Sequence, residues 1–383
     1  MTGSRQDPPV RILRVPVPAG EAPLESPEAW AVHGTVLLDH VVDAEIYGHD
    51  DLSLDAATVL GTMVREQDYE RVTRYVAVAD ELPEASGASA TPPPEAVVGR
   101  AIVRLPMKDN THLGTAHVRV HPQWRGRGIG SALWEACLAE IRDAGRTVII
   151  GDSDSGVEPP AGPDALEPPT GSGRFPRHDP GSVFALHRGF ALEQVYRHSE
   201  LELPVPVERL DALRSAAREC ATGYRVHVWR DEVPDERLGD LAVMETRMST
   251  DAPSGDLVIE EDRWDAARVQ EAHSALRERG RRFVLAAAEH VASGILAGFS
   301  MVSFAQDRPT VVDQEDTLVL REHRGHRLGM LVKVAVLDEL ANVNPQAVRV
   351  HTWNAEENDH MLAINVDLGF RPAGVGAEWQ LRL

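Results

Sequence analysis

Apolar residues recur every four positions in two separate stretches of the chain. The first set is Ile129, Leu133, Cys137 and Ile141, and the second is Leu328, Val332, Val336 and Leu340. This spacing places each set on one face of a helix. Each helix follows a strand-like run, "TAHVRV" or "EDTLVL", and precedes another, "RTVIIG" or "AVRVHTW". The pattern therefore predicts two copies of a strand–helix–strand unit.

Both copies continue in the same way after this unit. Each reaches a Gly-Phe pair, Gly189-Phe190 or Gly369-Phe370, and then a strand, "VYRHSELEL" or "AEWQLRL". A chain of 383 residues is long enough for two domains. We therefore expect two tandem α/β domains at residues 1–205 and 223–383, joined by a linker and helix at 206–222.

Other sequence patterns predict the remaining strands, helices and loops of both copies. In the first we expect a strand at Val10–Val17, helices up to about Arg74, a strand in "EAVVGRAIVRLPM" and a loop at Gly87–Pro94. The segment 151–181 holds seven prolines and six glycines, which predicts a mobile loop without regular structure. In the second copy we expect a strand in "YRVHVWRDEVP", a helix after Pro234, a helix closed by Gly280, and a hairpin.

Composition narrows the classes of partner. The formal net charge of −21 argues against binding to nucleic acid. The same charge suits an amine-bearing substrate, although it would equally keep the protein in solution. No apolar run is long enough to cross a bilayer, and the N-terminal residues lack the apolar core of a secretory signal. Two cysteines, Cys137 and Cys220, are typical of a reducing compartment, so we expect a cytoplasmic protein.

The hexapeptides "RGRGIG" (125–130) and "RGHRLG" (324–329) open the two helices. A glycine-containing turn between a strand and a helix exposes backbone N–H groups that suit a phosphate or pyrophosphate. Arg125, Arg127, Arg324 and His326 add positive charge nearby. Neither turn has the pattern of the common nucleotide-binding loops.

Taken in their context, these turns resemble the coenzyme A signature of the GNAT acetyltransferase superfamily. Arg125, Gly128 and Gly130 occupy its fixed positions, whereas in the second copy Arg327 replaces the middle glycine. The segment "TWNAEENDHMLAINVDLGFRP" resembles the other shared segment of the superfamily. The pair of motifs is similar to the tandem GNAT proteins of actinobacteria. This implies two GNAT-like domains, each with a mixed, mostly antiparallel central sheet flanked by helices.

The resemblance also implies acetyl-CoA as acyl donor, a small amine-bearing molecule as acceptor, and a set of coenzyme-binding residues. In the first copy these are Val118, Val120, Arg125, Gly126, Arg127, Gly128, Ile129, Gly130 and Ser131. In the second they are Leu318, Val319, Arg324, Gly325, His326, Arg327, Leu328 and Gly329. Asn354 and Asn358 either contact the coenzyme or cap a helix.

Candidate acid–base residues occur mainly in the second copy. Strand alternation places Asp313, Glu315 and Thr317 on one face and Asp316 on the other. In the family a base often lies on this strand, so Asp313, Glu315 and Asp316 are candidates, alongside the alternative of a solvated acidic edge. The position of the family's usual tyrosine acid holds Asn365, which could hydrogen-bond the thioester. We therefore expect the second half to be the catalytic one.

The resulting hypothesis is direct acyl transfer to an amine in a ternary complex. The alternatives are a non-catalytic acyl-CoA-binding or regulatory protein with two degenerate sites, and a peptide or protein acetyltransferase. No HExxH or CxxC pattern occurs, so we expect no metal site. No GxSxG pattern occurs either, which disfavours a serine hydrolase.

Overall fold

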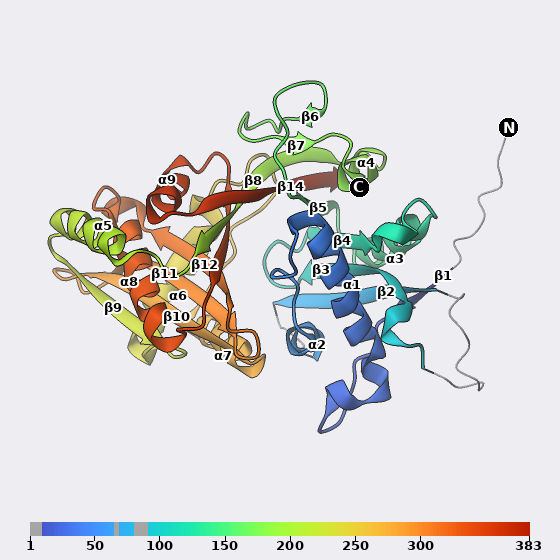
Figure 1. The fold of residues 1–383 in the computed structure, drawn as a ribbon, viewed down its shortest axis with the longest axis horizontal. Helices are drawn as coiled ribbons and strands as arrows, with labels where there is room; N and C mark the ends of the chain where they lie inside the picture. The colour runs from blue at the N-terminus through green and yellow to red at the C-terminus, as the bar shows by residue number, and fades with distance from the viewer. Residues whose placement is uncertain (1–9, 65–68, 80–90) are drawn as a thin grey trace.

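The computed structural model describes residues 10–64, 69–79 and 91–383, and in them twelve strands form one sheet that runs through the whole molecule (Figure 1). The strands of this sheet are β1 (Val10–Arg14), β2 (Glu70–Ala79), β3 (Val97–Pro106), β4 (Leu113–Val120), β5 (Val148–Ser155), β8 (Ala191–Glu202), β9 (Tyr224–Arg230), β10 (Arg281–His290), β11 (Leu296–Ala305), β12 (Val311–Val319), β13 (Arg349–Ala355) and β14 (Arg371–Arg382). Two short strands, β6 (Ala165–Leu166) and β7 (Phe175–Pro176), pair separately.

Helices cover both faces of this sheet. They are α1 (Trp30–Tyr47), α2 (Ala56–Val64), α3 (Ile129–Asp143), α4 (Pro180–Leu186), α5 (Val207–Cys220), α6 (Asp235–Asp251), α7 (Ala266–Glu278), α8 (Leu328–Val343) and α9 (Asp359–Leu368). We refer to β1–β5 with α1–α4 as the first half, and to β9–β13 with α5–α9 as the second half. The prediction of a mixed, mostly antiparallel sheet flanked by helices is confirmed, since only β4–β5 and β12–β13 pair in parallel.

The two halves exchange their last strands. The sheet order is β1-β2-β3-β4-β5-β14-β8-β13-β12-β11-β10-β9. The final strand of the chain, β14, therefore pairs with β5 of the first half, whereas β8 pairs with β13 of the second. The two long strands also pair with each other and run between the halves in Figure 1. The predicted domains, residues 1–205 and 223–383, therefore share one sheet and do not each form a separate sheet.

β14 contributes to the core beneath α3, and β8 contributes to the cores of both halves. Val195 of β8 and Trp379 of β14 are buried in the core beneath α3, whereas Leu201 of β8 lies in the core beneath α8. Burial of apolar surface is the main stabilising term in a folded chain. Each half therefore depends on the other for part of its stability.

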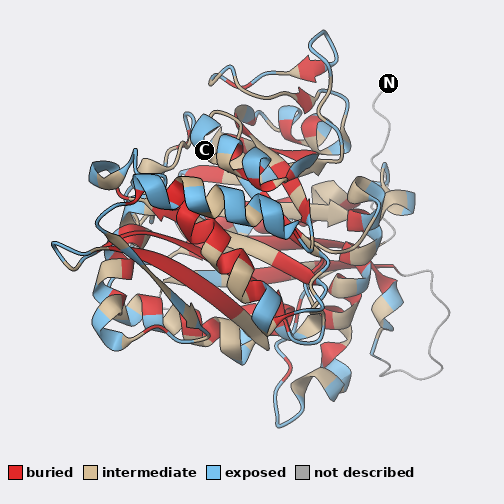
Figure 2. Cartoon of the chain, turned by 60° about the vertical axis from the view of Figure 1, so that its left-hand side comes forward, coloured by how far each residue is buried: buried red, intermediate tan, exposed pale blue. Residues whose placement is uncertain are grey.

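Four cores lie between the sheet and its helices, and Figure 2 shows the buried strands between partly exposed helices. In the first half, α1 and α2 pack on one face and α3 on the other. In the second half, α6 and α7 pack on one face, with α8 and α5 on the other. The helix expected within 206–222 is α5, which packs on α8 through the buried Ala217.

Two expectations about local structure are wrong. Helices were expected up to about Arg74, but β2 begins at Glu70. Its alternating residues contact opposite cores, with Val76 and Val78 beneath α1 and Tyr75 and Ala77 beneath α3. Such two-sided burial is typical of a central strand. Half of the loop predicted at Gly87–Pro94, residues 87–90, lies outside the described residues.

The proline-rich segment 151–181 also differs from its prediction. Its first residues continue β5 to Ser155, its middle forms the β6–β7 pair, and α4 starts at Pro180. Phe175 is fully buried and meets Trp379 edge to face, with ring centroids 6.2 Å apart. An aromatic anchor of this kind supplies the apolar burial that the local composition lacks.

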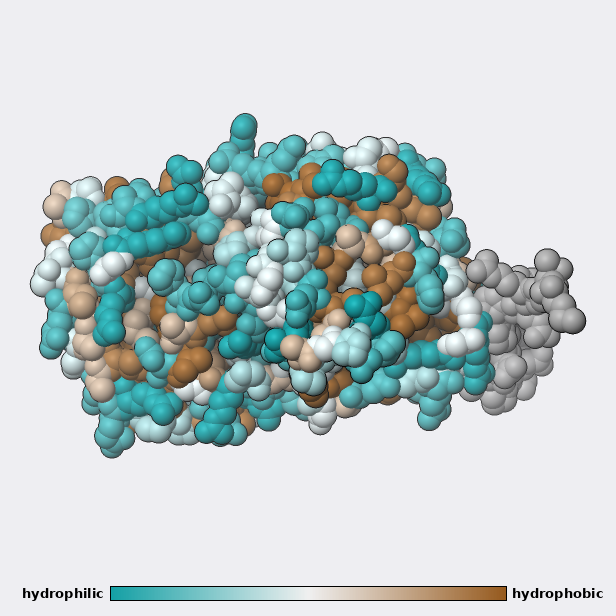
Figure 3. All heavy atoms as spheres, turned by 90° about the horizontal axis from the view of Figure 1, so that it is seen from above, coloured by the Kyte–Doolittle hydropathy of each residue, from teal (hydrophilic) through white to brown (hydrophobic). Residues whose placement is uncertain are grey.

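The surface bears no continuous apolar face in the view of Figure 3, where hydrophobic residues form separate patches among hydrophilic ones. Within the described ranges, none of the helices has the length and apolar character needed to cross a membrane.

A glycine on β14 makes the strand exchange sterically possible. An added Cβ at Gly376 would lie 1.9 Å from Cε2 of Tyr196 on β8, because the tyrosine ring covers this position. We expect Gly376→Ala to lower the free energy of unfolding by about 1–3 kcal/mol or more, the usual cost of overpacking. Urea unfolding followed by circular dichroism measures this change.

The matched control is Gly239→Ala, where an added Cβ would contact nothing within 4 Å. Because Gly239 lies within α6, alanine there should raise stability by about 0.5–1 kcal/mol. Equal unfolding midpoints for Gly376→Ala and the wild type would show that the ring of Tyr196 does not occupy this position.

Candidate active site

The first hexapeptide forms the turn between β4 and α3. Gly126 and Gly128 have φ values of +77° and +82°, which glycine adopts without strain. An added Cβ at either position would contact nothing within 4 Å, so the space above the turn is open. The first N–H groups of α3 have no acceptor within the helix. The turn can therefore bind a phosphate through backbone donors.

Arg125 fixes this turn to the rest of the first half. Its Nε donates to the carbonyl of Val120 at 3.2 Å, and its Nη atoms donate to both oxygens of Glu45 on α1, at 2.9 and 2.6 Å. A bidentate contact of this kind fixes the orientation of the guanidinium and also neutralises its charge. The charge of Arg125 is thus balanced by Glu45, and its contribution is to position the turn.

Two other cations lie at the start of α3. Arg127 stacks on Trp124, with 4.6 Å from its guanidinium carbon to the ring centroid. Arg188, which follows α4, donates to the hydroxyl of Ser131 at 2.8 Å and stacks on Phe184. Arg188 was not among the residues predicted from the sequence. Since it lies far from the motif along the chain, only the fold brings it to the turn.

The strands β4 and β5 diverge next to this turn. They pair only from Leu113–Thr115 to Val148–Ile150, so residues 116–120 of β4 have no strand partner on that side. A cavity of about 930 Å³ occupies the opening and continues to the turn. We call it the first cavity. Of the predicted residues it is lined by Val118, Val120, Arg125, Gly126, Gly128, Ile129, Gly130 and Ser131.

Asp152 on β5 presents a carboxylate to this cavity, and 43% of its side chain is exposed. Arg100 donates to Nδ1 of His117 at 3.0 Å, which leaves the imidazole proton on Nε2. That Nε2 lies 3.3 Å from Oδ2 of Asp152. Burial and the charge of Arg100 hold the pKa of His117 well below its usual value, so the ring is neutral. The ring thereby orients Asp152 towards the opening.

Asp154 lies two residues further along the same face of β5. Burial, with the nearby charge of Asp152 and despite Arg119, raises the pKa of Asp154 to about 7. Arg119 lies 3.6 Å from Asp154, and the hydroxyl of Tyr47 is hydrogen-bonded to it. The pKa of Asp152 is raised as well, because the walls of the cavity partly shield its half-exposed carboxylate from water. Two neighbouring carboxyl groups with raised pKa values are suited to acid–base chemistry.

The second hexapeptide repeats the backbone of the first. Gly325 has a φ of +86°, and Arg327 has a φ of +54° where the first turn has Gly128. A left-handed conformation is uncommon for a residue with a side chain. Arg324 donates to the carbonyl of Val319 at 3.2 Å and to Asp251 on α6 at 3.0 Å, just as Arg125 contacts Val120 and Glu45.

Several other predicted residues of the second turn contact other elements of the second half. His326 lies 3.2 Å from the carbonyl of Cys220 on α5. Leu328 is buried in the core beneath α8, and Leu318 faces the opposite core, beneath α6 and α7. An added Cβ on Gly329 would lie 3.1 Å from Ile364 of α9. Burial in this second set is therefore confined to the ends, while Arg324, Gly325, His326 and Arg327 remain exposed.

The three predicted asparagines have structural partners. The side chain of Asn358 accepts from the N–H of Met361 at 3.3 Å and so caps α9. Asn365 is buried and donates to Asn354 at 2.6 Å, while its Oδ1 has no hydrogen-bond partner. The helix-capping alternative therefore describes Asn358, and the other two residues form a pair.

The carboxylates of β12 do not follow simple alternation. Ser300 pairs with Thr317 and Val302 with Gln314, so Glu315 and Asp316 together face one residue of β11. This bulge turns Asp316 to the face of Glu315, and it turns Thr317 away. Ser303 donates to Glu315 at 2.6 Å on one face, and Ser300 contacts Thr317 at 2.8 Å on the other. The predicted division into faces is therefore wrong.

The second-half carboxylates lie together in a different environment. Asp313 is ion-paired with Arg281, whereas Glu315, Asp316 and Glu245 of α6 line a cavity of about 630 Å³. Burial and neighbouring carboxylates raise the pKa of Glu315 to about 7 and that of Glu245 to about 8. Asn110 and Lys108 of the first half also line this cavity, which lies between the two halves.

The sequence reasoning missed Asp152, Asp154, Arg188 and Glu245. The run "GDSDSG" contains the alternation that could have identified the two aspartates, because a strand continued past Gly151 would place both on one face. Its glycine and the prolines that follow instead suggested a loop. Nothing in the sequence around Arg188 or Glu245 marks either residue.

Comparison with known proteins is consistent with this geometry. Residues 63–157 match the model of a family described as acetyltransferase (GNAT) domain, and this region contains the first turn, β4 and β5. No curated protein matches the sequence.

Two solved structures share the fold across nearly the whole chain. A tandem GNAT protein from the clavulanic acid biosynthesis pathway, solved without acetyl-CoA, is 24% identical, with a TM-score of 0.67 over 97% of this chain and 98% of its own. A GCN5-related N-acetyltransferase from Sphaerobacter thermophilus is 14% identical, with a TM-score of 0.57 over 93% of each chain. Residues 63–157 therefore match a GNAT acetyltransferase domain, and the chain has the fold of a tandem GNAT protein throughout.

Proposed function

We propose that the protein transfers an acetyl group from acetyl-CoA to an amine of a small molecule, and that the first half performs the chemistry. The observation that carries this proposal is the first cavity, which joins an open turn of backbone donors to the carboxylates of β5. This choice of half differs from the expectation based on the sequence. A cytoplasmic location remains a prediction from the two cysteines.

In this proposal the first turn binds the pyrophosphate of acetyl-CoA. The N–H groups of Gly128, Ile129 and Gly130 are the donors, and Arg188 supplies positive charge beside Ser131. The pantetheine arm extends between β4 and β5, where residues 116–120 have no strand partner on that side. Backbone donors on this edge can polarise the thioester carbonyl.

In this proposal the substrate amine approaches the carboxylates of β5 from the side of the opening opposite the coenzyme. Asp152 accepts a proton from the substrate ammonium, and the neutral amine then attacks the carbonyl carbon of the thioester. The carbon–sulfur bond breaks, the nitrogen loses its second proton, and the thiolate takes up a proton to leave as free coenzyme A. Two acidic side chains beside the opening favour a cationic acceptor.

A direct transfer needs no cysteine nucleophile, and neither cysteine lines the first cavity. Cys137 is fully buried in α3, and burial raises its pKa to about 12. Cys220 lies on α5 in the second half. A thiol that stays protonated and buried cannot accept an acyl group at an appreciable rate.

The second half has a structural role in this proposal. Arg327 stands where the first turn has Gly128, and the start of α8 is largely buried. The second half completes the first through β14, whether or not it binds a coenzyme itself.

The two turns offer a matched test of where acetyl-CoA binds. Gly126 and Gly325 occupy equivalent positions, have similar positive φ values, and would both carry an added Cβ in open space. We expect Gly126→Asp to weaken acetyl-CoA binding by at least about tenfold, since a carboxylate would face the pyrophosphate. Gly325→Asp should leave the affinity within about twofold. Isothermal titration calorimetry measures both.

The backbone strain introduced by aspartate is the same in both variants, so the difference between them reports ligand contact alone. Loss of binding in Gly325→Asp, with affinity retained in Gly126→Asp, would place the coenzyme in the second half. Unchanged binding in both variants would contradict the use of either turn.

A further inference from the structure

Three side chains with metal-binding atoms meet where the exchanged strand β8 joins β13. His198 and Glu200 lie two residues apart on β8, so they share one face of the sheet. His351 on β13 is the register partner of Glu200. The three ligand atoms all lie within 4.8 Å of one another, and both histidines are fully buried.

We propose that His198, Glu200 and His351 bind one divalent metal ion of the zinc class. Nε2 of His198 lies 3.0 Å from Nδ1 of His351, and that Nδ1 lies 3.7 Å from Oε1 of Glu200. Ligands at zinc bond lengths in a tetrahedral site are separated by roughly 3.3 Å. These two separations bracket this value, and all three ligand atoms lie within 4.8 Å of one another, so small side-chain movements would bring them to ligand spacing.

The protonation pattern leaves the ligand nitrogen of His351 free, whereas His198 must move its proton before it can bind an ion. Nε2 of His351 lies 3.2 Å from the carboxylate of Asp51, which can only accept, so the proton is on Nε2 and Nδ1 carries a lone pair. His198 therefore donates from Nε2 to Nδ1 of His351, and its own Nδ1 has no hydrogen-bond partner. Binding of an ion through Nε2 replaces this hydrogen bond and moves the proton of His198 to Nδ1.

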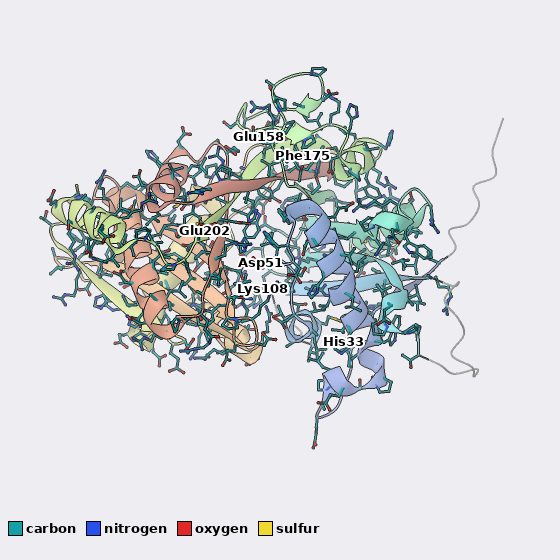
Figure 4. All side chains as sticks on the ribbon, viewed as in Figure 1. His33, Asp51, Lys108, Glu158, Phe175 and Glu202 are labelled. Carbon is teal, nitrogen blue, oxygen red and sulfur yellow. The ribbon has the colours of Figure 1, made fainter. Side chains whose placement is uncertain are left out.

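A second group of residues orients the three ligands, as is usual around protein-bound metals. Asp51 holds His351 as described, in the carboxylate–histidine arrangement that accompanies many zinc sites. Nδ1 of His49 accepts from the N–H of Asp51 at 3.3 Å, so its Nε2 donates to Glu200 at 2.8 Å. Figure 4 shows Asp51 between the two halves.

The charges around the site also favour a cation. Arg349 pairs with Asp51 at 2.7 Å and lies 3.6 Å from Glu200, so one guanidinium faces two carboxylates. Arg308 lies 3.4 Å from Asp51 but pairs more closely with Asp50, at 2.7 Å. One negative charge is therefore left without a full counter-charge among buried rings, where a divalent ion would be stabilised.

Three protein ligands leave one position of a tetrahedral ion for water or another molecule. The site also connects parts of the chain that are distant in sequence: two ligands come from β8, one from β13, and the orienting groups from the residues after α1. A bound ion would therefore fasten the loop that follows Tyr47 to the junction of the exchanged strands. The absence of HExxH and CxxC patterns does not bear on this site, because its ligands are dispersed along the chain.

The test uses the full-length protein after removal of metal with EDTA. Zinc is titrated in competition with a chromogenic chelator, and we expect one ion per chain. Glu200→Gln, which is nearly isosteric, and His351→Gln should each raise the dissociation constant at least about tenfold, and Asp51→Asn by about 10–100-fold. His323→Gln serves as control because His323 lies in another histidine cluster, beside Tyr224 and His290.

Cobalt provides a readout that does not depend on how well the variants fold. The wild-type protein loaded with Co²⁺ should show the intense visible bands of a four-coordinate ion. A weak spectrum typical of six-coordinate cobalt would overturn the proposal. Zinc binding unchanged by Glu200→Gln in a variant with native circular dichroism, or abolished instead by His323→Gln, would overturn it as well.

Discussion

Asp152→Asn is expected to lower kcat/KM for acetyl transfer by about 10²–10⁴-fold, the usual contribution of a general base. The change keeps the size of the side chain but removes its ability to accept a proton. Asp152 lies on the far side of the first cavity from the turn, so acetyl-CoA should bind with nearly unchanged affinity. Free thiol release from acetyl-CoA in the presence of a panel of amines measures the rate.

The pH dependence provides a second measurement of the same prediction. A base must be deprotonated to act, so kcat/KM of the wild type should rise with pH as the carboxyl groups of Asp152 and Asp154 lose their protons. The pKa of Asp154 is raised to about 7 and that of Asp152 is raised above its ordinary value, so the rise should lie at higher pH than for an ordinary aspartate. Asp154→Asn removes the neighbouring charge, so the remaining rise should move to lower pH.

The corresponding change in the second half is the control. Glu315 also has a pKa raised to about 7, so Glu315→Gln removes a comparable group from the other cavity. We expect it to change kcat/KM by less than about threefold. If Glu315→Gln were the inactive variant and Asp152→Asn retained its rate, the second half would be the catalytic one, as expected from the sequence.

Trp379→Ala should be the most destabilising of these single changes, by about 3–5 kcal/mol. Trp379 is 2% exposed, packs against Phe175, and donates from Nε1 to the hydroxyl of Ser153 at 2.8 Å. It also lines the first cavity. The variant should therefore unfold at lower urea concentration and also bind acetyl-CoA more weakly, although the substitution lies on β14, far in sequence from the first turn.

Two other tryptophan variants distinguish the loss of packing at Trp379 from the loss of a tryptophan elsewhere in the sheet. Trp379→Phe keeps most of the apolar contact and loses the hydrogen bond, so it should cost only about 1 kcal/mol beyond the lost volume. Trp229→Ala changes β9, at the opposite edge of the sheet. It should reduce stability without affecting acetyl-CoA affinity. Normal coenzyme binding by a folded Trp379→Ala protein would contradict the role of β14 in the first cavity.

Local sequence patterns predicted most of the elements around the two turns. The four-residue spacing along α3 and α8 identified both helices, because each buries one continuous stripe of side chains. The turns were recognised because glycine is needed where φ is positive, as at Gly126 and Gly128. These features depend only on residues close together in sequence.

The features that were not predicted depend on contacts between distant parts of the chain. No local pattern distinguishes β14 paired with β5 from β14 paired with its own half, since either partner buries Val375 and Ala377. The bulge at Glu315 and Asp316 depends on the register with β11. His198 and His351 are 153 residues apart, so only the completed sheet shows that they meet.

The exchange of β14 and β8 has a consequence for how the chain folds as it is synthesised. The strands β1 to β5 emerge early, but the edge of β5 is covered by β14, which lies much further along the chain. Until then that edge exposes unpaired backbone groups on a hydrophobic strand, a state that favours intermolecular pairing. The first half therefore cannot complete its sheet until residues 371–382 have left the ribosome. A prematurely terminated chain should aggregate.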